Sequence, residues 1–405
     1  MLLASLAFGI EKESAKVPKT IATPWVQASW RSPEIVRISQ VAAGIQGDLP
    51  EPRCGVSAFR MTYQIQNNNG PSIKASALLQ VPNCKVRKEM PLLIYNHSTR
   101  VGRQDVPSRQ AYDPESWATA MMFASYGVMV ALPDYRGFGA SDVDQIYLSK
   151  TTGEFDVYSL IQAVYEWTRS RKIQLNQELF IAGYSQGAHV TLSALEKLEN
   201  FPVGKLKLMA SAALSGVYGL DAAALDYVLK NGNAAHSTFV IMCVMTQLSI
   251  NSTHLPDGQT ILRPDSIVVG KKLLSGALSF KDGMRQLPDK PSGLFTADYL
   301  KKMYAEKEQN ALVKLLANES VDRLHIKTPT LVFAVKADET ASSDGARISS
   351  QRLKQNGTPV TLVIRDDRLN HVNASLPAFL EARQYFSTLS PKLKELLGAT
   401  FAPLK

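Results

Sequence analysis

Five short apolar runs, rich in Val, Ile and Leu, recur along the chain between residues 91 and 338. Little polar alternation occurs within them, which is typical of strands buried on both faces, as in a parallel sheet covered by helices. Patterns typical of helices lie between them, at 114–127, 156–170 and 185–200. Because strand and helix alternate, the sequence predicts a doubly wound α/β sheet. The five runs are PLLIYNHS, GVMVALPDY, ELFIAGYS, LKLMASAAL and TPTLVFAVKAD.

The alternation stops between about Ser215 and Glu306. Apolar segments in this interval are joined by polar and proline-containing connectors, and no convincing pair of sheet strands occurs there. We interpret residues 215–306 as a mostly helical insertion, or cap, on a core formed by residues 25–214 and 307–405. The apolar run at 237–248 is interpreted as cap core, although it could also line an apolar pocket or face lipid.

Two further strand-like runs, at 56–66 and 72–81, are joined by the turn-like NNNG and predict a hairpin. Cys54 and Cys84 lie just outside its open ends, so a disulfide between them is sterically possible. Cys243, in the run FVIMCVM, is interpreted as a packed apolar residue. The three cysteines lack the paired spacing of a zinc site, and we expect no metal.

Composition places the chain among folded globular proteins, with 45% hydrophobic and 20% charged residues over a length of 405. A net charge of +9 could indicate an acidic partner. However, Lys and Arg are spread along the chain, and no zinc-finger, RNP or basic-zipper pattern accompanies them. We therefore expect no nucleic-acid function, leave contact with a lipid interface open, and infer no specific protein partner.

The first residues, MLLASLAFGI, form an apolar run that ends in the small-x-small pattern of a signal cleavage site, but they lack a basic region. Residues 1–24 are interpreted either as a signal-like remnant or as a frayed, disordered terminus. The protein is accordingly predicted to be secreted or periplasmic, and otherwise cytoplasmic. No segment reaches the roughly 20 apolar residues that a membrane-spanning helix requires.

The stretch GYSQG carries the candidate nucleophile, because Ser185 lies between Gly183 and Gly187 immediately after a predicted strand. A helix-like pattern begins at Gln186, and a strand, a sharp turn and a helix in succession are the setting of a nucleophile elbow. Glycines on both sides allow backbones to approach closely, and the N-terminus of the helix presents unpaired N–H groups to an oxyanion.

A serine needs a base to take its proton, and the base needs an orienting acid. His371 follows the last strand-like run, at the sheet edge where α/β proteins bind ligands, and is the predicted base. His189 competes by sequence but lies one helical turn beyond the serine. The other candidates, His236, His254 and His325, are assigned structural or surface roles.

Asp338 leaves the end of the strand TPTLVFAVKAD directly and is the predicted acid. The alternatives are Glu339, Asp344, Asp366 and Asp367. The resulting order of Ser185, Asp338 and His371 along the chain is the serine, acid, histidine order of the α/β-hydrolase fold.

These motifs resemble those of the α/β-hydrolase superfamily over residues 55–390, with GYSQG as the elbow, VKADET as the acid loop and LNHVN as the histidine loop. The stretch LPDYRGFGASD resembles the superfamily's loop after the fourth strand, and we assign it a structural role in shaping the pocket wall. The resemblance implies a mostly parallel sheet with helices on both faces and a helical cap.

The segment YNHSTRVG resembles the Y-x-H-G-T segment of secretory lipases and related esterases. This resemblance implies that the backbone N–H groups of Thr99 and Gln186 form an oxyanion hole. The family's usual glycine is Ser98 here, which implies an altered loop or a position that tolerates a Cβ, and its hydroxyl is a candidate extra donor. His97 is interpreted as bracing the loop.

Together the residues predict a serine carboxylic-ester hydrolase, an esterase or lipase, that forms an acyl-enzyme on a small-molecule or lipid ester without any cofactor. A serine peptidase and an acyltransferase would use the same machinery, so both remain alternatives. A non-catalytic binding protein on a hydrolase scaffold is the alternative from another class.

Overall fold

The computed structural model describes residues 21–26, 52–65, 71–84, 89–109, 113–366 and 368–398. Most of the signal-like segment, residues 1–20, and the alternative acid Asp367 lie outside the described residues.

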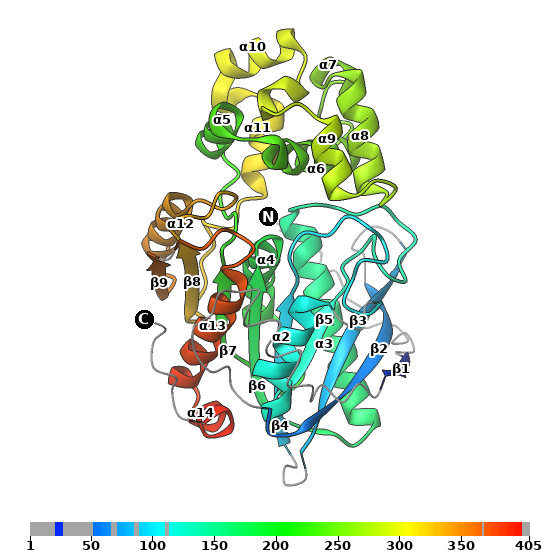
Figure 1. Ribbon diagram of the computed structural model, residues 1–405, viewed down its shortest axis with the longest axis vertical. Helices are drawn as coiled ribbons and strands as arrows, with labels where there is room; N and C mark the ends of the chain where they lie inside the picture. The colour runs from blue at the N-terminus through cyan, green and yellow to red at the C-terminus, as the bar shows by residue number, and fades with distance from the viewer. Residues whose placement is uncertain are drawn as a thin grey trace, which may run out of the picture.

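Within these ranges, nine strands form one sheet in the order β1-β2-β3-β5-β4-β6-β7-β8-β9. The pairs β1/β2, β2/β3 and β3/β5 are antiparallel. The pairs β5/β4, β4/β6, β6/β7, β7/β8 and β8/β9 are parallel. The predicted α/β sheet is confirmed (Figure 1). The strands are β1 Ile21–Val26, β2 Gly55–Ile65, β3 Ile73–Asn83, β4 Glu89–Asn96, β5 Met129–Pro133, β6 Gln174–Tyr184, β7 Lys207–Leu214, β8 Thr330–Val335 and β9 Val360–Arg365.

Two hydrophobic cores, one on each face, explain why the strands lack polar alternation. In β4, Leu92 and Ile94 pack into one core and Leu93 and Tyr95 into the other, as the two-residue period of a strand requires. Helices α3 Lys150–Ser170, α4 Gln186–Asn200 and α12 Ser343–Gln355 contribute to the first core. Helices α2 Pro114–Met122, α13 Ser375–Leu389 and α14 Pro391–Leu397 contribute to the second.

The interval between β7 and β8 is helical and lies above the carboxyl end of the sheet (Figure 1). It has a third hydrophobic core of its own, and Leu312 and Leu316 belong to this core. For this reason we extend the cap from the predicted residue 306 to Asn318. Its helices are α5 Ala222–Asn231, α6 Ala234–Ile250, α7 Gly258–Ile261, α8 Pro264–Leu274, α9 Phe280–Gln286, α10 Ala297–Glu306 and α11 Ala311–Asn318.

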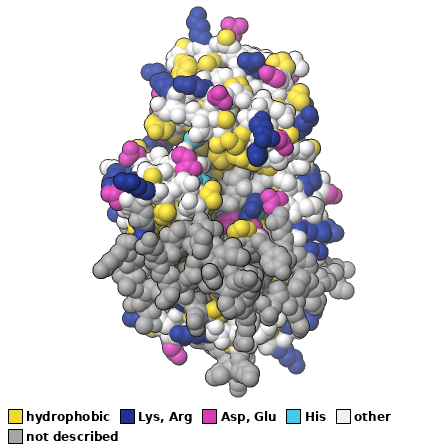
Figure 2. Space-filling view, in the orientation of Figure 1, with side chains coloured by type: hydrophobic (Ala, Val, Ile, Leu, Met, Phe, Trp, Pro, Cys, Tyr) yellow, Lys and Arg dark blue, Asp and Glu magenta, His cyan; other side chains and the backbone are white. Residues whose placement is uncertain are grey.

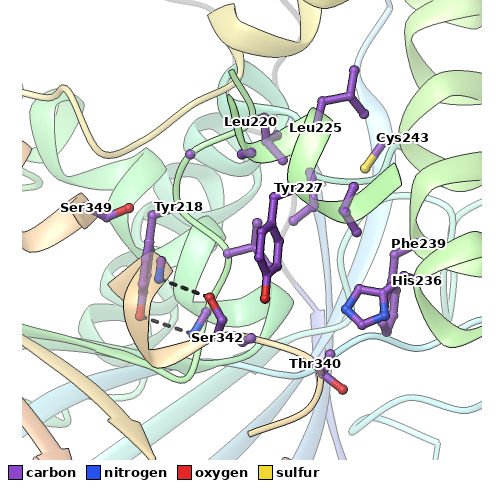
Figure 3. A pocket seen from close by; sticks show the side chains of 18 of the residues that line it. Tyr218, Leu220, Leu225, Tyr227, His236, Phe239, Cys243, Thr340, Ser342 and Ser349 are labelled. Carbon is purple, nitrogen blue, oxygen red and sulfur yellow. Dashed lines mark hydrogen bonds between the residues drawn. The ribbon is translucent and has the colours of Figure 1, made fainter. Parts of the chain in front are cut away.

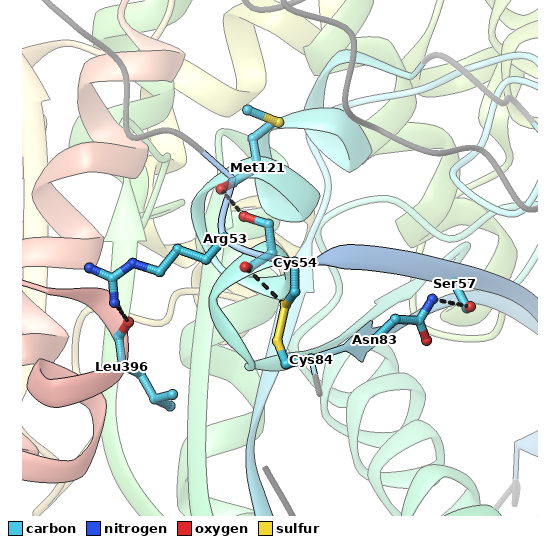
Figure 4. Close-up of a disulfide and its surroundings, with 8 residues drawn as sticks. Arg53, Cys54, Ser57, Asn83, Cys84, Met121 and Leu396 are labelled. Atoms are coloured by element: carbon cyan, nitrogen blue, oxygen red, sulfur yellow. Dashed lines mark hydrogen bonds between the residues drawn. A yellow bond between two sulfur atoms is a disulfide. The ribbon is translucent and has the colours of Figure 1, made fainter. Parts of the chain in front are cut away.

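The hairpin of β2 and β3 is closed at its open end by a disulfide between Cys54 and Cys84 (Figure 4). Gly55 pairs with Asn83 in the antiparallel register, so the preceding and following cysteines face each other. Cys243 is a free, buried cysteine of α6 in the cap core. The structure therefore contains the disulfide that the positions of the two hairpin cysteines make possible.

Candidate active site

A sharp turn between β6 and α4 presents Ser185 at the carboxyl edge of the sheet. Ser185 has φ 56° and ψ −118°, a conformation that side-chain-bearing residues rarely adopt. A Cβ at position 183 would collide with the Gly187 carbonyl, and a Cβ at position 187 would collide with the Asn96 carbonyl. Both flanking glycines are thus required by close backbone approach, and the turn projects the serine side chain out of the sheet.

Ser185, His371 and Asp338 lie in one hydrogen-bonded chain. The Ser185 Oγ is 2.9 Å from His371 Nε2, and His371 Nδ1 is 2.8 Å from Asp338 Oδ2. Asp338 follows β8 and is buried, and its Oδ1 accepts hydrogen bonds from the N–H groups of Thr340 and Ala341. These bonds hold the carboxylate in place with Oδ2 as the nearer oxygen to Nδ1 and Oδ1 at 3.0 Å from it, so Nδ1 carries its proton and Nε2 is free to accept one from the serine.

The backbone of the histidine loop is held on two sides. The hydroxyl of Tyr184, the residue before the candidate nucleophile, donates to the His371 carbonyl. Glu339 Oε2 accepts the His371 N–H at 3.0 Å, so this alternative acid contacts the backbone of His371. The other described alternatives are ion-paired elsewhere, Asp344 with Arg347 and Asp366 with Lys336.

Two competing histidines bind backbone carbonyls away from the serine. His189 Nε2 lies 2.8 Å from the Glu319 carbonyl oxygen, and burial lowers the pKa of His189 to about 4. His325 Nδ1 contacts the Asn356 carbonyl at the opposite edge of the sheet. Their positions fit the structural roles expected from the sequence.

His236 lies close to the candidate site, which sequence reasoning missed. It is the third residue of α6, where it forms a capping box with Asn233, and its ring faces the backbone of Thr340 in the acid loop (Figure 3). Burial lowers its pKa, while the nearby carboxylates of Asp338 and Glu339 oppose this shift. Only the docking of the cap onto the acid loop brings this histidine to the site, and no local sequence signal marks it.

The loop predicted to supply an oxyanion donor, residues 97–100, follows β4 and lies beside the elbow; it is called the oxyanion loop below. The Thr99 hydroxyl is 2.9 Å from the Tyr147 hydroxyl, and the Tyr135 hydroxyl donates to the His97 carbonyl at 3.0 Å. His97 is fully buried and its ring packs at a tilt against the ring of Tyr135, in keeping with a bracing role. The predicted donors are the N–H of Thr99 in this loop and the N–H of Gln186 in the first turn of α4, where helical N–H groups lack intrahelical partners.

Ser98 is hydrogen-bonded to the buried carboxylate of Glu115. Its N–H lies 3.1 and 3.2 Å from the two oxygens of Glu115, and its hydroxyl donates to Glu115 Oε2 at 2.9 Å. The Ser98 hydroxyl therefore does not serve as an extra oxyanion donor in this arrangement. Glu115 belongs to α2, and the one clue in the sequence is the polar Ser98 where the resembled family has glycine.

A cavity of about 540 Å³ lies between the cap and the sheet, with Ser185, Gln186 and Asp338 among its lining residues. Hydrophobic side chains gather at this junction on the surface shown in Figure 2. Figure 3 shows Phe239 and Cys243 of α6 on one side of the cavity and Tyr218 and Ser342 on the other. The arrangement places the candidate nucleophile at the base of a largely apolar space.

Among the described residues, no group of three or more His, Cys, Asp or Glu side chains is arranged to hold a metal ion. The helices of the described ranges are all too short or too polar to cross a membrane.

No protein-family profile matches the chain, and no curated protein sequence matches it. Solved structures do. The rice cell wall degrading esterase LipA from Xanthomonas oryzae aligns over 92% of this chain and 99% of its own, with a TM-score of 0.81 at 19% identity. A Legionella pneumophila protein provisionally named a hydrolase aligns over 93% and 97%, with a TM-score of 0.79 at 19% identity.

Lipase A from Candida antarctica aligns over 95% of this chain and 82% of its own, with a TM-score of 0.63 at 14% identity. At such identities the likeness concerns the fold, and it spans the sheet and the cap together. The chain has the α/β-hydrolase fold that its motifs predict.

Proposed function

We propose that the protein is a serine carboxylic-ester hydrolase that acts through an acyl-enzyme. The observation that carries this proposal is the hydrogen-bonded chain from Ser185 through His371 to Asp338 at a strained elbow. Backbone strain of this kind persists where the surrounding structure enforces it, and it is concentrated at functional sites. A binding protein without catalysis has no need of an imidazole hydrogen-bonded to a serine that lines a cavity.

In this mechanism the Ser185 Oγ attacks the ester carbonyl while His371 Nε2 takes its proton. Asp338 stabilises the imidazolium, and the N–H groups of Thr99 and Gln186 stabilise the tetrahedral oxyanion. His371 then gives the proton to the leaving alcohol, and the acyl group stays on Ser185. A water molecule, deprotonated by His371, attacks the acyl-enzyme and releases the acid, which restores the serine hydroxyl.

The apolar cavity favours an ester with a hydrophobic acyl or alcohol group over a peptide. Apolar side chains such as Leu225, Val240 and Val244 line it, and several charged side chains of its wall are ion-paired with one another. Two of the similar structures are named an esterase and a lipase. We therefore place ester hydrolysis before peptide hydrolysis and acyl transfer.

Fluorophosphonate labelling tests this function directly, because the reagent requires an activated serine. We expect one label on Ser185, located by mass mapping, and turnover of p-nitrophenyl esters with a defined optimum between acetate and palmitate. Preference for the shortest ester would exclude a lipase but not an esterase. Absence of both label and ester turnover in the folded protein would reject the proposed function.

Cys243 is expected to limit the length of the acyl group. It lines the cavity from α6, and burial raises its pKa to about 12, so it is a neutral, compact wall residue (Figure 3). Cys243→Phe should lower kcat/KM for octanoate relative to acetate by about tenfold or more, since a single methylene can be discriminated by about 10- to 200-fold in an apolar pocket. The conservative variant Cys243→Ala should not disfavour the longer ester. Equal losses for both esters in Cys243→Phe would contradict this role.

We further propose that the protein works in an oxidising compartment, as a secreted or periplasmic enzyme. The disulfide between Cys54 and Cys84 supports this, because such bonds persist outside the reducing cytosol. Exposed apolar side chains at the mouth of the cavity, Tyr227 and Ile348, fit contact with a lipid or aggregated-ester surface.

A further inference from the structure

We propose that Glu115 is a positioning residue for the oxyanion loop, and that it acts through Ser98 to fix the direction of the Thr99 N–H. The inference rests on the proposed function, since it assigns a purpose to the loop within that reaction. It concerns a buried acid of α2 that touches neither the cavity nor the hydrogen-bonded chain of Ser185, His371 and Asp338.

Glu115 binds the loop through several donors at once. In addition to the N–H and hydroxyl of Ser98, its oxygens accept hydrogen bonds from the Tyr95 hydroxyl and the Arg100 guanidinium, both at 2.8 Å. Tyr95 is the penultimate residue of β4 and Arg100 is the last residue of the loop, so one carboxylate connects both sides of the turn. Hydrogen bonds to a charged acceptor are the stronger kind, which makes this a rigid attachment.

The peptide between Ser98 and Thr99 is clamped by these contacts. The Ser98 carbonyl lies 2.6 Å from His97 Nδ1, which must carry a proton to donate to it, and burial lowers the pKa of His97 and keeps the ring neutral. In a planar trans peptide the N–H points opposite to the carbonyl. With the carbonyl held by His97 and the Ser98 N–H held by Glu115, the Thr99 N–H has one available direction.

This arrangement explains why serine is suitable where the resembled family has glycine. Glycine leaves a loop with more backbone freedom. Ser98 instead supplies two donors to the same carboxylate, its N–H and its hydroxyl, and so restricts its own backbone. The side chain of Ser98, which departs from the family pattern, thereby adds a second hydrogen bond between the loop and Glu115.

The negative charge of the buried Glu115 carboxylate is partly offset by the Arg100 guanidinium. Burial raises the pKa of Glu115, and the positive charge of Arg100 opposes this. Arg100 also pairs with Asp113, the N-cap of α2, at 2.5 Å. Both acids lie at the N-terminus of a helix, where the helix dipole favours negative charge.

Glu115→Gln tests the inference, because the amide keeps the size of the side chain but replaces one acceptor oxygen by a donor. Oxyanion stabilisation acts in the transition state, so kcat should fall by about 10- to 100-fold while KM changes little. The factor should be the same for acetate and octanoate esters, since every ester forms the same oxyanion. Amide hydrogen exchange in residues 97–100 should become faster in the variant without substrate.

Glu199→Gln is the matched control. Glu199 likewise accepts backbone N–H groups, from Lys327 and Thr328, and the Thr328 hydroxyl, but it does so in the loop before β8, at the opposite edge of the sheet. The variant Glu199→Gln should leave kcat and the amide hydrogen exchange of residues 97–100 unchanged. Ser98→Ala, which removes only the hydroxyl, should show the same effects as Glu115→Gln to a smaller extent and serves if Glu115→Gln does not fold.

The two readouts separate this inference from the proposed function. Unchanged exchange at 97–100 in the folded variants would overturn the inference whatever the activity. Faster exchange with an unchanged kcat would also overturn it, because the loop would then be held for stability alone. A parent protein that hydrolyses no ester and takes no fluorophosphonate label would instead reject the proposed function.

Discussion

Ser185→Ala is expected to lower kcat for ester hydrolysis by about 10⁶-fold, the scale on which a catalytic serine acts within its triad. The reason is the geometry of the elbow, which presents the Ser185 Oγ to His371 Nε2 at 2.9 Å. The measurement is the steady-state hydrolysis of the best p-nitrophenyl ester. Alanine retains the Cβ at the strained position, so the variant should fold and melt as the parent does.

Ser193→Ala is a suitable control for this variant. Ser193 is a buried serine of the same helix, and its hydroxyl donates to the His189 carbonyl. Its replacement should change stability slightly and leave kcat near the parent value. If Ser185→Ala kept more than a small fraction of the parent activity, a different nucleophile would be operating.

The second large effect is expected for Asp338→Asn, with a loss of about 10⁴-fold in kcat. Asp338 Oδ1 accepts two backbone N–H groups, so the amide oxygen of asparagine should take that position and the NH₂ group should face His371. An NH₂ group donates to Nδ1 and thereby places the imidazole proton on Nε2. The ring could then no longer accept the proton of Ser185. The measurement is the pH-rate profile, in which the kcat of the variant should lie below that of the parent throughout the neutral range.

Glu339→Gln distinguishes this role from that of the neighbouring acid. Glu339 is exposed and binds the His371 backbone N–H, which a glutamine oxygen can also accept. The change should alter kcat by about twofold at most, as for most surface substitutions. A larger loss in Glu339→Gln than in Asp338→Asn would reverse the assignment of the acid.

Strands and the elbow could be predicted because their signals are local. A buried strand such as ELFIAGYS, followed by closely spaced glycines, specifies both the burial of β6 and the turn at Ser185. Chain order and the parallel sheet then place Asp338 and His371 at the same edge. Each of these steps needs only nearest neighbours in sequence or the rule that parallel strands end together.

Glu115 and His236 could not be predicted in this way. An acid in the first turn of a helix is common, because it stabilises the helix dipole, and no feature of the helix sequence distinguishes Glu115 from such a residue. The polar Ser98 marks its own loop as unusual but does not identify its partner. His236 is a capping residue by its spacing from Asn233. Its second role, facing Thr340, exists only because the cap rests on the acid loop. Contacts of this kind depend on tertiary packing, which the local pattern does not encode.

The position of the cap in the chain has a consequence for biosynthesis. Ser185 precedes the cap, and Asp338 and His371 follow it, so the ribosome makes the candidate nucleophile well before the candidate base and acid. N-terminal parts of a chain leave the ribosome first. The serine of a nascent chain therefore stays chemically inert until the cap has been synthesised and β8 and β9 have joined the sheet. Under the proposed mechanism, hydrolytic activity reports that translation has passed His371 and that the whole fold has closed.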